Sequence, residues 1–171
     1  MNDLIQENSG AFDLPALDLT RFPNTQTLNA VGEKYLVFFL GEEFYAVASK
    51  SVAEAAASLV VTTLPNAPDW LLGIANLRGE VISVINLPAI LRKENLTPAA
   101  KPKFIVLRSQ VFESSVAFAA NRISEIVELP EEKIQLITDG KSPHIFGKAV
   151  HKSQTLNLID MEKLLASLSI N

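Results

Sequence analysis

Short apolar runs separated by polar turns recur along most of the chain, and this pattern predicts β-strands. Residues 35–40 and 44–48 flank a short turn that contains Gly41, which indicates a β-hairpin. The same texture returns later in the chain. We expect further strands at 81–85, 103–107, 115–119 and 154–159.

Two segments carry helical signals instead. Asp160 offers a side-chain acceptor directly before Met161–Leu168, whose apolar residues fall on one face of a helix. Trp70–Leu72, after the proline-containing loop 62–69, reads as a helical turn. The pattern as a whole predicts a mainly β chain with a short C-terminal helix.

The two halves of the chain can be overlaid on each other. Matched pairs include Tyr35 with Phe104, Glu54 with Glu125, and Gly73 with Gly147, at offsets of 69, 71 and 74 residues. A slowly growing offset is what loop insertions produce, because loops tolerate changes of length. Chance likeness between apolar strands is the alternative. The overlay predicts two small β-barrels or rolls packed together, with interlocked halves at approximately 33–100 and 101–168, since small sheets hide their edges best by closing.

Residues 1–32 differ from the rest of the chain and read as a flexible N-terminal leader. They are polar, acidic and broken by two prolines, and chain ends stay poorly ordered unless something ties them down. A leucine-containing motif at 14–19 leaves open a docking role, on a partner or on the protein's own surface. We expect the folded domain at 33–168.

Composition and charge exclude several classes. With 48% hydrophobic residues and 20% charged residues, the chain is not a disordered one. A formal charge of −4 argues against binding to nucleic acid, because phosphate contacts need clustered cations. The sequence has no signal-peptide pattern and no apolar stretch long enough for a bilayer. We therefore expect a cytoplasmic protein without direct membrane insertion.

Catalytic and cofactor signatures are also missing. The chain has no cysteine, and its seven glycines form neither a dinucleotide loop nor a phosphate loop. Its two histidines, His144 and His151, are seven residues apart, so on one straight strand they would face opposite sides. We therefore predict no catalytic residue, no cofactor and no metal site, and interpret the protein as a binding module.

Two isolated charges stand out. Glu54 lies in the otherwise apolar stretch 52–61, and Arg78 is the one charge between Trp70 and Gly79. Two unrelated surface charges are the default interpretation. If the strand of Glu54 lies beside the turn of Arg78, however, the guanidinium can pair with the carboxylate and fix the shape of an apolar surface.

Four segments resemble the CheW-like domain family, the coupling proteins of bacterial chemosensory systems. The segment 76–87, Asn-Leu-Arg-Gly-Glu-Val-Ile-Ser-Val-Ile-Asn-Leu, is similar to the family signature. Residues 35–47 resemble its opening hairpin, 52–54 its Val-x-Glu element, and 156–165 its last strand and helix. The resemblance implies two five-stranded SH3-like β-barrels with a groove between them.

The same resemblance implies adaptor function. It predicts binding to the regulatory domain of a CheA-type histidine kinase and to the cytoplasmic tip of methyl-accepting chemoreceptors, and leaves room for other CheW-like domains as partners. The family's Glu–Arg pair corresponds to Glu54 and Arg78, and a receptor-contact valine to Val52. With the turn around Arg78, the predicted partner-binding residues are Val52, Glu54, Asn76, Leu77, Arg78 and Gly79.

The chain departs from the family pattern at Asn86, Pro88 and Asn121. These departures fit a specialised copy, such as one that serves pilus-linked motility. Two other classes stay open from the residues alone. One is a ligand-binding or enzymatic β-barrel protein that uses the inter-barrel cleft near His144 and His151, and the other is a self-assembling structural protein.

Overall fold

The computed structural model describes residues 32–93, 96 and 99–169. Within these residues the chain forms twelve strands, two α-helices and two short 3-10 helices. The elements are β1 (Glu33–Leu40), β2 (Glu43–Ala48), η3 (Ser49–Ser51), β3 (Val52–Ala56), β4 (Val61–Thr62), β5 (Leu71–Leu77), β6 (Glu80–Ile85), α1 (Leu87–Ile90), β7 (Lys103–Leu107), β8 (Val116–Ala120), β9 (Arg122–Leu129), η4 (Glu131–Lys133), β10 (Gln135–Leu136), β11 (Ile145–His151), β12 (Gln154–Ile159) and α2 (Met161–Leu168).

The strands form two sheets. Sheet A has the order β10-β11-β12-β2-β1-β9, and sheet B has the order β3-β7-β8-β6-β5-β4. Each sheet has six strands rather than the predicted five, because the two-residue strands β4 and β10 each add to an edge. The mainly β class with two subdomains and a C-terminal helix is confirmed.

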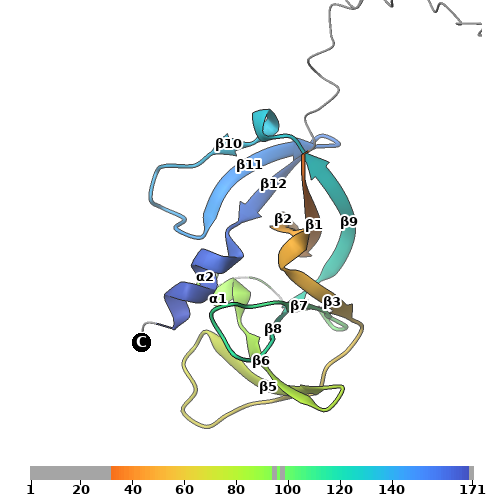
Figure 1. Ribbon diagram of the computed structural model, residues 1–171, viewed down its shortest axis with the longest axis vertical. Coiled ribbons are helices and arrows are strands. Elements are labelled where there is room, and N and C mark those ends of the chain that lie inside the picture. The colour runs from red at the N-terminus through yellow and green to blue at the C-terminus, as the bar shows by residue number, and fades with distance from the viewer. Residues whose placement is uncertain (1–31, 94–95, 97–98, 170–171) are drawn as a thin grey trace, which may run out of the picture. The chain divides into compact units, whose positions relative to one another are not determined.

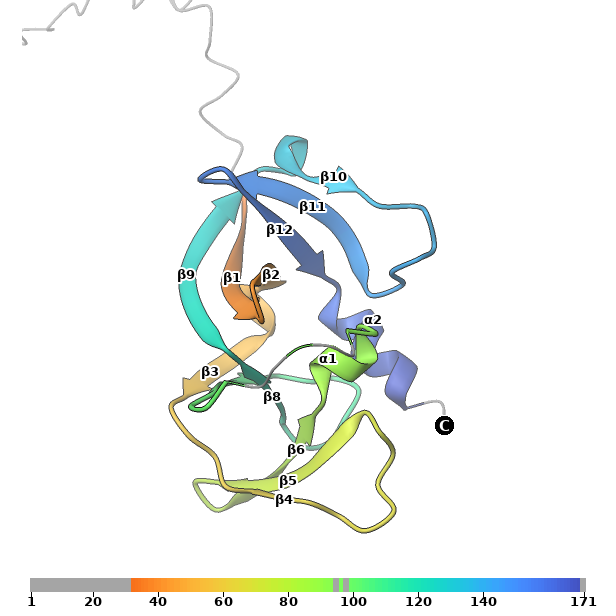
Figure 2. The ribbon, with the colours of Figure 1, turned by 180° about the vertical axis from the view of Figure 1, so that it is seen from behind.

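The two sheets follow one plan, with a hairpin exchanged between the repeats. When β1–β6 are matched in order with β7–β12, equivalent strands occupy equivalent positions in the two sheets. The hairpin β1–β2, however, lies in the sheet formed by β9–β12, and the hairpin β7–β8 lies in the sheet formed by β3–β6. Thus β2 pairs in parallel with β12, and β8 pairs in parallel with β6. Figures 1 and 2 show the early hairpin β1–β2 among the late strands β9, β11 and β12. The internal repeat predicted from the sequence is therefore present.

Three apolar clusters hold this arrangement together. One lies within sheet A, one within sheet B, and the largest joins residues of both sheets with α1 and α2. Strand β1 contributes residues to two of these clusters. Tyr35 and Val37 belong to the sheet A cluster, and Leu36 and Phe38 belong to the cluster that both sheets share. A strand buried on both faces reads as a continuous apolar run, which explains the unbroken run at 35–40.

Several elements predicted from the sequence can be compared directly with the observed ones. Strands at 103–107 and 154–159 and the helix at 161–168 have the predicted bounds, and the Asp160 side chain accepts a hydrogen bond from the Lys163 N–H at 3.0 Å. The helical turn at Trp70–Leu72 is wrong, because β5 already begins at Leu71. A bulge at Leu72 interrupts the pairing there and hides the strand from a pattern of simple alternation.

The predicted halves 33–100 and 101–168 do not coincide with the two sheets. Sheet B consists of strands between 52 and 120, whereas sheet A combines β1 and β2 with strands after 121. The exchange of hairpins is the physical reason, because each sheet needs strands from both sides of residue 100. Of the predicted leader, only Gly32 belongs to the described residues. No helix in the described ranges is long and apolar enough to cross a membrane.

Candidate functional site

The predicted partner site begins on strand β3, at the edge of sheet B. Glu54 pairs with Val106 of β7, while Ala53 is the extra residue of a bulge between Val52 and Glu54. A bulge adds local twist and changes the direction of the neighbouring side chain. Glu54 is thereby held at the strand edge, with its side chain 26% exposed.

The hairpin β5–β6 supplies the cation. Its two turn residues, Arg78 and Gly79, both have positive φ, 54° and 91°, as in a type I′ turn. The Asn76 side chain accepts a hydrogen bond from the Gly79 N–H at 3.0 Å and so ties the turn to its own strand. Arginine seldom adopts a positive φ, so this turn places Arg78 at a modest cost in backbone energy.

Glu54 and Arg78 meet as the sequence predicted. The Nη2 atom of Arg78 lies 2.9 Å from Oε2 of Glu54. The Arg78 side chain remains 80% exposed, so the pair orients the guanidinium and leaves most of it open to a partner. An ion pair this exposed contributes little to stability, about 0–1 kcal/mol.

A shallow hollow of about 270 Å³ lies against the ion pair. Glu54, Leu77 and Arg78 line it together with four other residues, and Glu80 and Ser115 are polar members that the sequence reasoning missed. Asn76 and Gly79 build the turn behind it. Val52 does not line the hollow, because it lies beyond the bulge and packs against the shared core. The six predicted residues therefore divide into a group around the β5–β6 turn and Val52, which is partly buried near the shared core.

A second ion pair occupies the equivalent position in sheet A. Lys152, in the β11–β12 turn, lies 2.9 Å from Glu125 of β9, and both turn residues again have positive φ. The hydrogen bond from Lys152 holds the pKa of the Glu125 carboxyl below its usual value. His151 lies 3.6 Å from the same carboxylate. The overlay of the two halves matched Glu54 with Glu125, but the match of Arg78 with Lys152 was missed, although the offset of 74 residues found at Gly73 and Gly147 also connects these two turn residues.

The histidines lie at separate places. His144 precedes β11 and lines a small hollow with Arg92 and Lys141. Burial, followed by the Lys163 charge, lowers the pKa of its imidazole. Among the described residues no group of three His, Asp or Glu side chains is placed to hold a metal ion.

With the geometry in hand, comparison with known proteins identifies the family. The model of the CheW-like domain matches residues 34–169, most of the chain. The chain belongs to the CheW-like domain family. The match includes both sheets, both ion pairs and the C-terminal helix of the fold described above.

Individual members of the CheW-like family agree with this assignment. The chain is 31% identical to a probable chemotaxis protein CheW of Rhizobium etli, over 82% of this chain and 92% of the relative. It is 28% identical to the chemotaxis protein CheW of Klebsiella aerogenes, over 80% and 84% of the two chains. The crystal structure of scaffolding protein TtCheW from Thermoanaerobacter tengcongensis has the same fold, with a TM-score of 0.69 and 22% identity over 78% of this chain and 87% of that one.

Proposed function

We propose that this protein is a non-enzymatic adaptor that couples chemoreceptors to a CheA-type histidine kinase in a bacterial chemosensory array. The observation that carries the proposal is the Glu54–Arg78 pair, held at a fixed turn on a CheW-like fold. Relatives named as chemotaxis proteins, and a solved relative named as a scaffolding protein, support the same role. Because the proposed partners are the cytoplasmic tip of a receptor and a kinase domain, we also propose a cytoplasmic location.

The proposed kinase-binding surface is the outer face around the β5–β6 turn. Arg78 offers a guanidinium whose direction Glu54 fixes, and Leu77 adds apolar area in the hollow that both residues line. An arginine with neighbouring apolar area is typical of residues that dominate binding energy. Leu77, Asn76 and Gly79 keep the turn in place, so we assign them to the same surface.

The proposed receptor contact lies nearer the junction of the two sheets. Val52 packs against the core that both sheets share, which puts it where an amphipathic helix of a receptor tip can lay apolar anchors between the subdomains. Two surfaces of different character, one charged and one apolar, allow the two partners to bind together.

Binding measurements with single substitutions test the proposal. Full-length protein is titrated calorimetrically with a kinase regulatory domain and, separately, with a receptor cytoplasmic fragment. Arg78→Ala and Glu54→Lys should weaken kinase binding at least tenfold, about 1.4 kcal/mol. Lys152→Ala is the matched control, because it removes a cation from the equivalent turn, and it should change affinity by less than threefold.

The outcome is decisive if the variants remain folded, which thermal unfolding establishes. Absence of binding by the unsubstituted protein to both partners would refute adaptor function. Equal losses from Arg78→Ala and Lys152→Ala would refute the assignment of the Glu54–Arg78 surface.

A further inference from the structure

A large cavity at one end of sheet B takes no part in the proposed adaptor function. It measures about 650 Å³ and lies between sheet B, helix α1 and the described residues Leu96, Ala99 and Pro102. Its walls are mostly apolar and include Leu40, Leu72, Ile85 and Phe104. Cavities of this size and lining are typical of sites that enclose small molecules.

The other repeat contains the equivalent cavity, and there it is largely filled. Its volume is about 220 Å³. The two cavities share six equivalent lining positions: Leu72 with Phe146, Ile85 with Ile159, Asn86 with Asp160, Pro88 with Glu162, Phe104 with Tyr35 and Ala119 with Ala48. The fold therefore does not require an open apolar space at this place.

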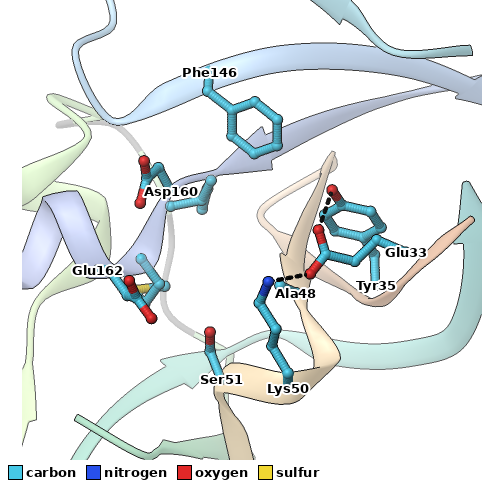
Figure 3. A pocket seen from close by; sticks show the side chains of 10 residues that line it. Glu33, Tyr35, Ala48, Lys50, Ser51, Phe146, Asp160 and Glu162 are labelled. Carbon is cyan, nitrogen blue, oxygen red and sulfur yellow. Dashed lines mark hydrogen bonds and ion pairs between the residues drawn. The ribbon is translucent and has the colours of Figure 1, made fainter. Parts of the chain in front are cut away.

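Charged and aromatic side chains narrow the smaller cavity. Figure 3 shows the Glu33 carboxylate between the Lys50 ammonium and the Tyr35 hydroxyl, with the Phe146 ring facing the same space. In the larger cavity Phe104 has no hydroxyl, and Leu72 takes the place of the larger Phe146. No side chain fills the space between these apolar walls. An apolar ligand that displaces water from them therefore binds with a favourable free energy.

The polar groups of the larger cavity indicate the charge of the ligand. Among the described residues that line it, the one cation is Lys93, which already forms an ion pair of 2.9 Å with Glu43, so little attraction remains for an anion. Within the described part of the chain, the Asn86 side-chain amide makes two long hydrogen bonds of 3.4 Å, one to the carbonyl of Asp69 and one from the N–H of Ala89. An amide engaged this weakly can exchange partners with a neutral hydrogen-bonding group.

We propose that this cavity, between α1 and the Phe104 end of sheet B, is a binding site for an uncharged, mostly apolar small molecule that carries one hydrogen-bonding group. The site goes beyond the adaptor function, because Glu54 and Arg78 lie around the β5–β6 turn and do not line it. The apolar walls supply the binding energy, and Asn86 orients the ligand.

Two fluorescent probes that differ by one charge test the site. N-phenyl-1-naphthylamine is uncharged, and 8-anilinonaphthalene-1-sulfonate is the same ring system with a sulfonate. Titrated into the full chain, the neutral probe should bind at one site per chain and at least tenfold more tightly than the sulfonate. No binding of the neutral probe, or equal binding of both, would overturn the proposal.

Substitutions in the two cavities locate the binding. Ala119→Leu fills the large cavity, and Ala48→Leu is the matched control at the equivalent position of the small one. Ala119→Leu should weaken binding of the neutral probe at least tenfold, and Ala48→Leu should leave its affinity within twofold of the unsubstituted protein. If Ala119→Leu fails to fold, Leu72→Phe makes the same test with the residue that the other repeat carries. Retention of affinity in the filled variant, or equal loss in the control, would refute the site.

Discussion

Sheets A and B place equivalent strands in the same order, yet they offer different surfaces and different interiors. Sheet B presents an arginine on an Arg-Gly turn and encloses an open apolar cavity. Sheet A presents a lysine on a Lys-Ser turn and has a smaller cavity, of about 220 Å³, with the Glu33–Lys50 pair in its wall. The arrangement of the strands therefore fixes where a site can lie, while a few side chains at equivalent positions decide what it binds.

The two turns illustrate how small the deciding changes are. Arg78 can hold a carboxylate bidentately with a planar guanidinium, whereas Lys152 is a point charge on a flexible stem. Asn76 ties the first turn to its strand, and Val150 stands at the corresponding place in the second. We therefore expect sheet B, rather than sheet A, to carry the more specific contact.

The largest expected difference between the repeats concerns the glycines at their bulged strands. Gly73 has a φ of 149°, and a Cβ there would collide with the backbone carbonyl oxygen of Thr62. Gly73→Ala should therefore lower the free energy of unfolding by about 3 kcal/mol or more. At Gly147 an added Cβ would lie 2.8 Å from Cγ2 of Ile134 and 3.1 Å from the backbone carbonyl oxygen of Gln135, both farther away than the Thr62 oxygen is from Gly73, and φ there is outside the left-handed region. Gly147→Ala should cost only about 1 kcal/mol, and urea unfolding measures both.

Equal costs at the two glycines would contradict this difference. They would mean that the repeats are constrained alike at this point. The midpoint of unfolding should shift without a change in the denaturant slope, because neither substitution alters the surface exposed on unfolding.

The smallest expected effect concerns the stability contributed by the ion pairs. A double-mutant cycle with Glu54→Ala and Arg78→Ala should give a coupling energy of about 0.2–1 kcal/mol, because the pair is exposed. The coupling between Glu125 and Lys152 should be no larger. Thermal or urea unfolding at low and high salt measures both coupling energies, and high salt should reduce them. A coupling well above this range, or unfolding of the single variants, would make the Glu54–Arg78 pair a structural element rather than a presented surface.

Much of the fold was predictable because local patterns and the repeat agree. The run at 35–40, the strand at 154–159 and the Asp160 cap each depend on neighbouring residues, and the sequence displays them. The Glu54–Arg78 contact was predictable from two isolated charges and the family resemblance. At the departure Asn86, the side chain accepts from the Ala89 N–H at the start of α1, as Asp160 does for α2, so the family fold tolerates the change.

Other features depend on contacts between distant segments and leave no local signal. The exchange of hairpins follows from the parallel pairing of β2 with β12 and of β8 with β6, which no short pattern encodes. The strand at Leu71–Leu77 was missed because a bulge and a positive φ at Gly73 break its alternation. The sequence does not predict the large cavity, because Phe104 and Tyr35 count equally as apolar positions in a hydrophobic pattern. In the structure, Phe104 lines the large cavity, whereas Tyr35 helps to fill the small one.

The most direct test of the central claim, that this protein joins two partners at once, is the mass of the complex in solution. Sedimentation velocity is recorded for the protein, a CheA-type regulatory domain and a chemoreceptor fragment, in pairs and together. Adaptor function predicts a species that contains all three proteins and forms only when this protein is present. Displacement of one partner by the other, or no association of either, would contradict it.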